Sequence, residues 1–357
     1  MFFPPPPARE PASSNDASAD LQKHNPPIDD KTPKEPQLPL HGPSASDPGA
    51  ETPRAHEGSL KLFRLAGTDV YVHWSWFVIA VYMIQDRAIP FSSIAWDIVE
   101  YVAGFGIVLL HEFGHVLACK QGGGTAKSIL LWPLGGLAFV QPMPRPGALL
   151  WTTVAGPLVN LILAPILFRL AYFLAPGEDD PITDLYLLVR ILAFFNVLIL
   201  IFNVLPIYPL DGGRMLHALL WWIVGRSKGL AIASLIGFPI AVVLGIYAFS
   251  EKDWWLVAMT VFLGLGAFGG MRRAQLLLPL DQAIRRKEFT CPHCKMNPPA
   301  GDFWRCQKCQ NKFDIFDPLQ TCPTCGDFCM DIPCVECGSI FPGADWPKPQ
   351  IDQPSNA

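Results

Sequence analysis

The chain has 357 residues, of which 50% are hydrophobic and 16% are charged, and its 27 Lys and Arg against 31 Asp and Glu give a formal net charge of −4. Soluble domains contain about 25% charged residues, so this composition argues against a soluble globular enzyme. It also argues against a basic nucleic-acid-binding protein, because no excess of positive charge is present to neutralise phosphates.

The apolar residues lie in runs that divide the chain into four segments. Residues 1–58 are rich in proline and polar residues and hold too few aliphatic residues to offset the entropy of ordering, so we expect a disordered arm without a signal peptide. Residues 59–275 hold the long apolar runs of a membrane domain. Residues 276–340 hold nine of the ten cysteines, and residues 341–357 are expected to form a flexible tail.

The membrane segment predicts an all-α polytopic fold. A helix that crosses the hydrocarbon layer needs about 20 mostly apolar residues, and the segment contains six such runs. The predicted spans are Val70–Ile84, Ile94–Cys119, Ala148–Ala175, Leu185–Ile207, Gly229–Phe249 and Trp254–Gly270.

The charges between the predicted spans indicate their orientation. Lys and Arg accumulate in cytoplasmic loops. Basic residues cluster before the first span, between the second and third, between the fourth and fifth, and after the sixth, whereas the other loops are acidic or mixed. This alternation predicts that both termini lie in the cytoplasm, and the even number of predicted spans agrees with it, because an even number puts both termini on the same side.

A metal-binding pattern, His111-Glu112-Phe113-Gly114-His115, lies within the second predicted span. Residues i and i+4 share one face of a helix, so both imidazoles can bind one zinc ion while Glu112 takes a proton from a bound water. The same pattern arises by chance on soluble helices. Within a spanning helix, each ionisable residue costs about 2.5–3.5 kcal/mol on insertion scales, so its presence there favours a metal site.

A catalytic zinc ion usually has three protein ligands and one position left for water. The candidate third ligand is Asp211, which follows Pro206 and Pro209 at the cytoplasmic end of the fourth predicted span. An Asp-Gly pair after proline is also ordinary turn chemistry. The predicted topology favours a ligand, because it puts His115 and Asp211 at similar depth, where a broken helix is tolerated only if protein or a wet cavity covers its backbone.

These motifs together resemble a known family. HEFGH, VAGPLVNL and NVLPIYPLDGG, in this order, resemble the site-2 protease family of intramembrane zinc metalloproteases, and VYVHWSWF at residues 70–77 resembles the first span of its six-span branch without a PDZ domain. The resemblance covers about residues 60–273 and neither flank. It implies that His111, His115 and Asp211 are zinc ligands and that Glu112 is the catalytic glutamate.

The resemblance also implies a loop beside the site. Ile129–Val140, with Pro133, Gly135 and Gly136, is expected to form a membrane-re-entrant β-hairpin loop. Because a substrate helix must unwind before its peptide bonds can be attacked, an edge of this loop could accept the unwound segment as an added strand.

Asn160, in GPLVN, matches a family asparagine near the active site and could donate a hydrogen bond to the developing oxyanion, a role worth about 3 kcal/mol elsewhere. The alternative is a helix-packing amide, since polar residues commonly bond across membrane helices.

The cysteine-rich segment predicts two structural zinc sites, because two Cys-x-x-Cys knuckles supply four thiolates in tetrahedral geometry. Disulfides are disfavoured by the reducing cytoplasm in which the segment is predicted to lie. Sequential pairing would make two small ribbons, at residues 291–309 and 322–337, and interleaved pairing is the alternative. The four pairs are Cys291 and Cys294, Cys306 and Cys309, Cys322 and Cys325, and Cys334 and Cys337.

The segment resembles the double zinc-ribbon modules of many prokaryotic proteins, which implies binding or regulation. Between residues 291 and 337 it holds four basic and six acidic side chains, a balance that disfavours nucleic acid and favours a cytosolic protein partner.

The sequence therefore predicts an intramembrane zinc metalloendopeptidase of the lipid bilayer that cleaves transmembrane protein substrates, with one catalytic and two structural zinc ions. The resemblance to the family implies that the protein lies in the bacterial inner membrane. The alternative is a catalytically silent adaptor whose ribbons recruit partners, but such a protein would be free to lose Glu112. A metal transporter would need a file of polar residues across several spans, and outside the catalytic group mainly Arg169 and Arg190 are present.

Overall fold

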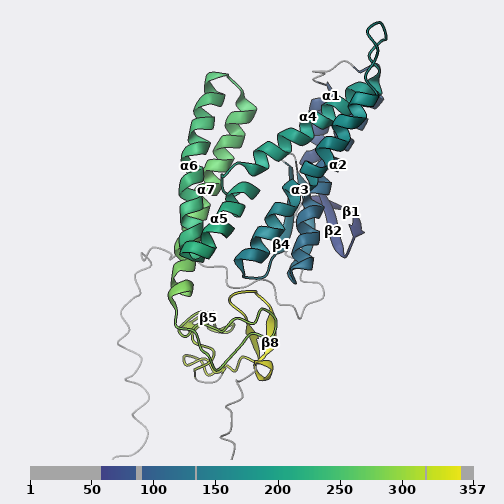
Figure 1. Ribbon diagram of the computed structural model, residues 1–357. Helices are drawn as coiled ribbons and strands as arrows, with labels where there is room; N and C mark the ends of the chain where they lie inside the picture. Colours follow the sequence, from purple (N-terminus) through teal and green to yellow (C-terminus); the bar gives the residue numbers. More distant parts are fainter. Residues whose placement is uncertain (1–57, 86–90, 133–134, 318–319, 347–357) are drawn as a thin grey trace, which may run out of the picture. The chain divides into compact units, whose positions relative to one another are not determined.

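The computed structural model describes residues 58–85, 91–132, 135–317 and 320–346 (Figure 1). Residues 1–57 of the predicted arm, Pro133 of the predicted loop and residues 347–357 of the tail lie outside the described residues. Within the described part, five helices are long and apolar enough to cross a membrane. They are α2 (Ile94–Gln121), α3 (Pro146–Phe173), α4 (Asp184–Val204), α6 (Arg226–Ser250) and α7 (Trp254–Gln282).

The first predicted span differs from the structure. Its first residues, from Val70, lie in strand β2 (Thr68–His73) instead of a helix. The following helix α1 (Ser75–Gln85) has 11 residues. Such a helix rises about 16 Å, against about 30 Å of hydrocarbon. Five of the six predicted spans are therefore supported, whereas the first predicted span, and with it the total of six, is not.

A four-stranded mixed sheet accompanies the helices, so the all-α prediction was incomplete. Its strand order is β1 (Ser59–Leu65), β2, β3 (Thr125–Trp132) and β4 (Gly135–Gln141). β1 and β2 pair antiparallel, and β2 and β3 pair parallel. β3 and β4 pair antiparallel with Trp132 opposite Gly135, which is the hairpin expected within 129–140. β4 lies at one edge of this sheet.

One face of α2 packs against the sheet. Side chains alternate between the two faces of a strand, so the strands direct every second apolar residue toward this helix. The shared cluster comprises Val70, Val72, Val108, Phe113, Val116, Ala126, Ile129 and Leu131. The contact fixes α2 against β2 and β3 along the turns that carry the histidines.

The remaining helices extend from α2 in sequence. α3 packs against both α2 and α4, and α5 (Asp211–Val224) packs against α3 and α6. α6 lies alongside α7 (Figure 1). The packing contacts of α3 with α2 and α5 put α3 between the helix that carries HExxH and the helix that begins at Asp211.

Side-chain oxygens cap the starts of two helices. Thr183 accepts from the amide of Tyr186 at α4, and Asp253 accepts from the amide of Leu256 at α7.

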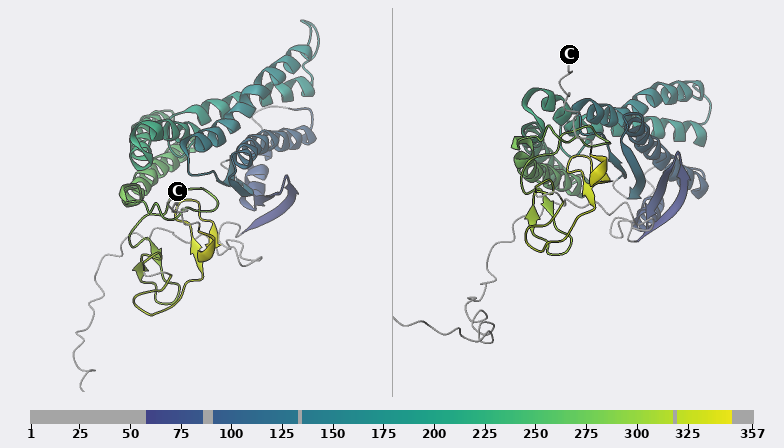
Figure 2. Two further views of the ribbon diagram at one scale, coloured as in Figure 1. Left: turned by 60° about the horizontal axis from the view of Figure 1, so that its bottom comes forward. Right: turned by 90° about the horizontal axis from the view of Figure 1, so that it is seen from below.

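The cysteine-rich segment forms two short hairpins, shown in yellow-green and yellow in Figure 2. They are β5 (Trp304–Arg305) with β6 (Lys312–Phe313), and β7 (Asp331–Pro333) with β8 (Ile340–Pro342), followed by the short 3₁₀ helix η1 (Gly343–Asp345). Their common apolar core comprises Trp304, Phe313, Ile315, Phe316, Ile332 and Trp346, together with buried cysteines. This core is small, which is typical of a module held together by metal ions.

Candidate metal centre and catalytic residues

Three potential ligand atoms converge inside the membrane domain. The Nε2 atoms of His111 and His115 lie 3.1 Å apart, and each lies 3.1 Å from the same carboxylate oxygen, Oδ2 of Asp211. All three side chains are buried. Two zinc ligands with bonds of 2.0–2.1 Å at tetrahedral angles lie about 3.3 Å apart, so the observed spacing suits one zinc ion.

The hydrogen bonds on the far side of each ring support a cation at this place. Nδ1 of His115 lies 2.7 Å from the backbone oxygen of Thr152, which can only accept, so this nitrogen carries a proton. Nδ1 of His111 lies 2.5 Å from Oδ1 of Asn160. In the neutral imidazoles, Nε2 is then an unprotonated acceptor, and two such nitrogens face a carboxylate. A metal ion satisfies this group of acceptors, so the residues fit zinc.

The residues that hold the histidines are spaced along one face of α3. Thr152, Gly156 and Asn160 recur every four residues, so they face α2 together. A Cβ atom on Gly156 would lie 2.3 Å from Nε2 of His115 and 2.8 Å from Nε2 of His111. Any side chain at this position would therefore displace the ligands, which explains the glycine.

Asp211 reaches the site because the chain breaks between α4 and α5. α4 ends at Val204, residues 205–210 form a loop, and α5 begins at Asp211. A Cβ atom on Gly212 or Gly213 would lie 2.3 Å from backbone atoms of this loop, so only glycine permits the close return. The predicted break at the prolines is present, and it presents the carboxylate to the histidines.

Glu112 lies at the edge of the sheet. Its Oε2 accepts a hydrogen bond of 2.9 Å from the backbone amide of Ala138 in β4. A Cβ atom on Gly136 would lie 2.4 Å from Cγ of Glu112, so the strand approaches this side chain as closely as a glycine allows. The predicted general base therefore contacts the hairpin that was predicted to receive the substrate.

Asn160 is fully buried against His111, and its partner was missed by sequence reasoning. Nδ2 of Asn160 donates to Oδ1 of Asn196 on α4 at 2.7 Å, and Nδ2 of Asn196 donates to the backbone oxygen of Asn160 at 2.9 Å. Asn196 lies in the middle of an apolar span, and this position was the available signal. The roles of Thr152 and Ala138 depend on backbone atoms, which residue type does not reveal.

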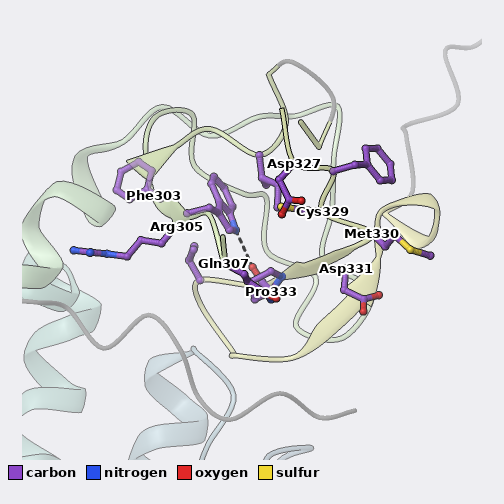
Figure 3. A pocket seen from close by; sticks show the side chains of 12 residues that line it. Phe303, Arg305, Gln307, Asp327, Cys329, Met330, Asp331 and Pro333 are labelled. Atoms are coloured by element: carbon purple, nitrogen blue, oxygen red, sulfur yellow. Dashed lines mark hydrogen bonds between the residues drawn. The ribbon is translucent and has the colours of Figure 1, made fainter. Parts of the chain in front are cut away.

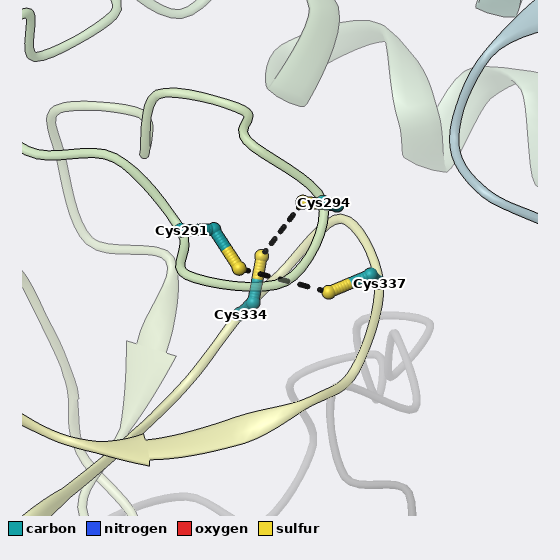
Figure 4. A group of neighbouring side chains, drawn as sticks. All are labelled: Cys291, Cys294, Cys334 and Cys337. Atoms are coloured by element: carbon teal, nitrogen blue, oxygen red, sulfur yellow. Dashed lines mark hydrogen bonds between the residues drawn. The ribbon is translucent and has the colours of Figure 1, made fainter. Parts of the chain in front are cut away.

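The eight cysteines form two groups of four, and the pairing is nested. Cys291 and Cys294 meet Cys334 and Cys337, whereas the second and third knuckles meet each other. In the first group the Sγ atoms of Cys291 and Cys337 lie 3.8 Å apart, as do those of Cys294 and Cys334 (Figure 4). The predicted sequential pairing is therefore wrong, because the first knuckle pairs with the fourth and the second pairs with the third.

The sulfur spacing suits tetrahedral zinc in both groups. Zn–S bonds of about 2.3 Å put tetrahedral sulfurs about 3.8 Å apart. In the second group the Sγ distances are 3.5 Å for Cys306 and Cys325 and 3.6 Å for Cys309 and Cys322. Hydrogen bonds from the thiols of Cys294 and Cys334 lower the pKa of Cys291 to about 6.

A cavity of about 260 Å³ opens beside the hairpins of this segment (Figure 3). Trp304 forms part of its wall, with the indole Nε1 donating to the backbone oxygen of Pro333 at 2.9 Å. Phe328 and Met330 line it while remaining 60% and 74% exposed. Asp327, Asp331 and Arg305 supply its charged groups.

Known proteins resemble this chain in the region that contains the candidate metal centre. The sequence model of peptidase family M50 matches residues 101–178 and 178–244, which include HExxH and Asp211. A zinc metalloprotease of Methanocaldococcus jannaschii is 31% identical over 209 residues, covering 58% of this chain and 59% of that protein. Stage IV sporulation protein FB of Bacillus subtilis is 31% identical over 118 residues, covering 32% of this chain and 37% of that protein. A solved site-2 protease from Methanocaldococcus jannaschii is 29% identical with a TM-score of 0.46, covering 60% of this chain and 95% of that one.

These matches confirm the predicted resemblance: residues 101–178 and 178–244 match peptidase family M50, and the relatives that align with them include a zinc metalloprotease. The family and the five apolar helices together identify an integral membrane protein. The chain spans 59% and 37% of the lengths of the two curated relatives described above.

Proposed function

We propose that this chain is an intramembrane zinc metalloendopeptidase that hydrolyses peptide bonds in or near the transmembrane segments of other proteins, as in regulated intramembrane proteolysis. One observation carries the proposal. Two imidazole nitrogens and a carboxylate oxygen converge within 3.1 Å of one another beside Glu112, and His111, Glu112 and His115 come from an apolar helix long enough to cross a membrane.

Four residues of the site would have two different roles in hydrolysis. His111, His115 and Asp211 would hold zinc. A bound zinc ion would supply Lewis-acid polarisation of the scissile carbonyl and a water whose pKa falls from about 15.7 to about 7. Glu112 would accept the proton of that water and later deliver it to the leaving amine. The burial of all four side chains strengthens these electrostatic interactions.

We propose that β4 receives the substrate as an added strand. A transmembrane helix hides its peptide groups in its own hydrogen bonds and must unwind before attack. β4 is an edge strand, and the amide of Ala138 points away from β3 toward Glu112. Backbone directions alternate along a strand, so the polar groups of Gly136 face the same way. A substrate strand paired here would run past the catalytic glutamate.

The membrane orientation is a further part of the proposal. Basic loops alternate with acidic or mixed ones along the chain, which supports cytoplasmic termini. This orientation requires an even number of crossings, and therefore one crossing within the predicted membrane domain, 59–275, in addition to the five long helices. The proposed location in a bacterial inner membrane follows from the family resemblance alone.

We propose that the cysteine-rich segment, 276–340, binds two structural zinc ions and a cytosolic protein partner. The nested cysteine groups support the two ions. The partner is supported by Phe328 and Met330, which are large, apolar and exposed beside a cavity, and by the acidic balance of the segment. Apolar side chains grouped in this way typically mark an interaction surface.

The proposed protease activity can be tested by co-expression. Single-span membrane proteins with cytoplasmic tags are expressed with the wild type or with Glu112→Gln, which keeps the size of the side chain and removes the base. Fragments produced only by the wild type would support the protease. Identical fragment patterns with zinc bound in both forms would favour the silent adaptor.

A further inference from the structure

Two buried amides behind the metal centre form a chain of hydrogen bonds that ends on a proposed zinc ligand. Asn160 on α3 and Asn196 on α4 are both 0% exposed. Burying an amide without partners costs free energy, so two buried amides in apolar helices need an explanation. The explanation lies in the direction of their hydrogen bonds.

The donor and the acceptor of each hydrogen bond follow from the contact between Asn196 and the backbone. Asn196 contacts the backbone oxygen of Asn160, which only accepts, so the atom contacting it is Nδ2 and Oδ1 of Asn196 faces the other way. Oδ1 of Asn196 must then accept from Nδ2 of Asn160. This leaves Oδ1 of Asn160 facing Nδ1 of His111 at 2.5 Å. An amide oxygen cannot donate, so Nδ1 of His111 carries the proton.

We propose that Asn160 and Asn196 are positioning residues, which fix the tautomer and ring orientation of His111 so that its Nε2 lone pair faces the metal. This inference rests on the proposed zinc function. It gives Asn160 a role different from the oxyanion contact expected from sequence, because the amide oxygen holds His111 and Nδ2 is bonded to Asn196. Groups that orient a metal-bound histidine through its second nitrogen commonly tune metal affinity.

The two histidines are held in different ways. His115 donates to the backbone oxygen of Thr152, a contact that substitution at that residue preserves. His111 instead depends on a side chain, and that side chain depends on Asn196. The amide pair is therefore a point at which zinc binding is sensitive to residues that do not touch the ion.

The test measures zinc binding by the purified full chain against a chelator that buffers free zinc. The His115→Ala variant defines the part of the binding curve that belongs to this site. Asn160→Leu keeps the approximate size but removes the acceptor, and Asn160→Asp restores an acceptor. The matched control is Thr153→Val on the same helix, because within the described part of the chain the Thr153 hydroxyl bonds to carbonyls of its own helix, at Leu149 and Leu150.

We expect Asn160→Leu to weaken zinc binding at this site by about 10-fold to 100-fold, with Asn160→Asp close to the wild type and Thr153→Val unchanged. Asn196→Leu should give a smaller loss, and it replaces Asn160→Leu if that variant does not fold. Equal affinity in Asn160→Leu and Thr153→Val would overturn the inference, and so would an Asn160→Asp variant as weak as Asn160→Leu, because packing would then explain the loss.

Failure of the proposed function would look different. The expected zinc affinities in a wild type that cleaves nothing would leave the positioning role standing and remove the protease. If the wild type bound no zinc in a manner that depends on His115, both the positioning role and the proposed protease function would be overturned.

Discussion

Gly156 lies where the two histidine nitrogens meet, and its replacement by alanine should disable the metal centre. The new Cβ atom would lie 2.3 Å from Nε2 of His115 and 2.8 Å from Nε2 of His111. Ordinary van der Waals contact begins near 3.4 Å. The His115 ring must therefore move by about 1 Å, and misplacements of that size can cost about 100-fold in activity. Overpacking would add about 1–3 kcal/mol of destabilisation.

Gly106 provides the matched control, because it also lies in a membrane helix but a Cβ atom there meets nothing within 4 Å. Both changes improve helix propensity by up to about 1 kcal/mol, so a difference between them reports the contact with the histidines. Zinc content at buffered free zinc and cleavage of a tagged membrane substrate would be measured for both. Wild-type zinc content and cleavage in Gly156→Ala would refute the proposed ligand geometry.

Two further changes test other parts of the molecule. Ala138→Pro removes the amide that Glu112 accepts from, so cleavage should fall while zinc content stays at the wild-type level; unaltered cleavage would contradict the proposed role of the β4 edge. In the cysteine-rich segment, nested pairing predicts that Cys291→Ser with Cys334→Ser releases one zinc ion per chain and Cys291→Ser with Cys306→Ser releases two, as measured by metal analysis. The opposite result would restore sequential pairing.

The parts of the fold that were predictable from sequence are those with a strong local signal. Long apolar runs gave five of the helices, and the i, i+4 spacing of His111 and His115 gave their common face. The error at Val70 has a physical cause: a short apolar run has the same hydropathy whether it forms a buried strand or a helix. β2 pairs with β3 across more than 50 residues, and such long-range pairing leaves no local pattern.

The candidate site shows the same limit. HExxH and the Asp-Gly-Gly turn could be identified in the sequence, because their residue types and spacing are those of metal ligands and a tight turn. Cys-x-x-Cys spacing defines a knuckle but not its partner, so the nested pairing became visible only in the structure. Asn196 is an ordinary amide until Asn160 and His111 are seen beside it. Ala138 contributes only a backbone N–H, which every residue except proline possesses.

The central claim, hydrolysis inside a transmembrane segment by a glutamate-activated water, can be tested most directly with the purified protein in lipid vesicles. A tagged single-span substrate that the co-expression panel identifies would be incubated in ¹⁸O-labelled water, and its fragments mapped by mass spectrometry. We predict a cut in or next to the apolar segment, ¹⁸O in the new carboxyl group, and a loss of at least about 100-fold with Glu112→Gln. A cut confined to distant soluble regions, or equal cleavage by Glu112→Gln, would contradict the account.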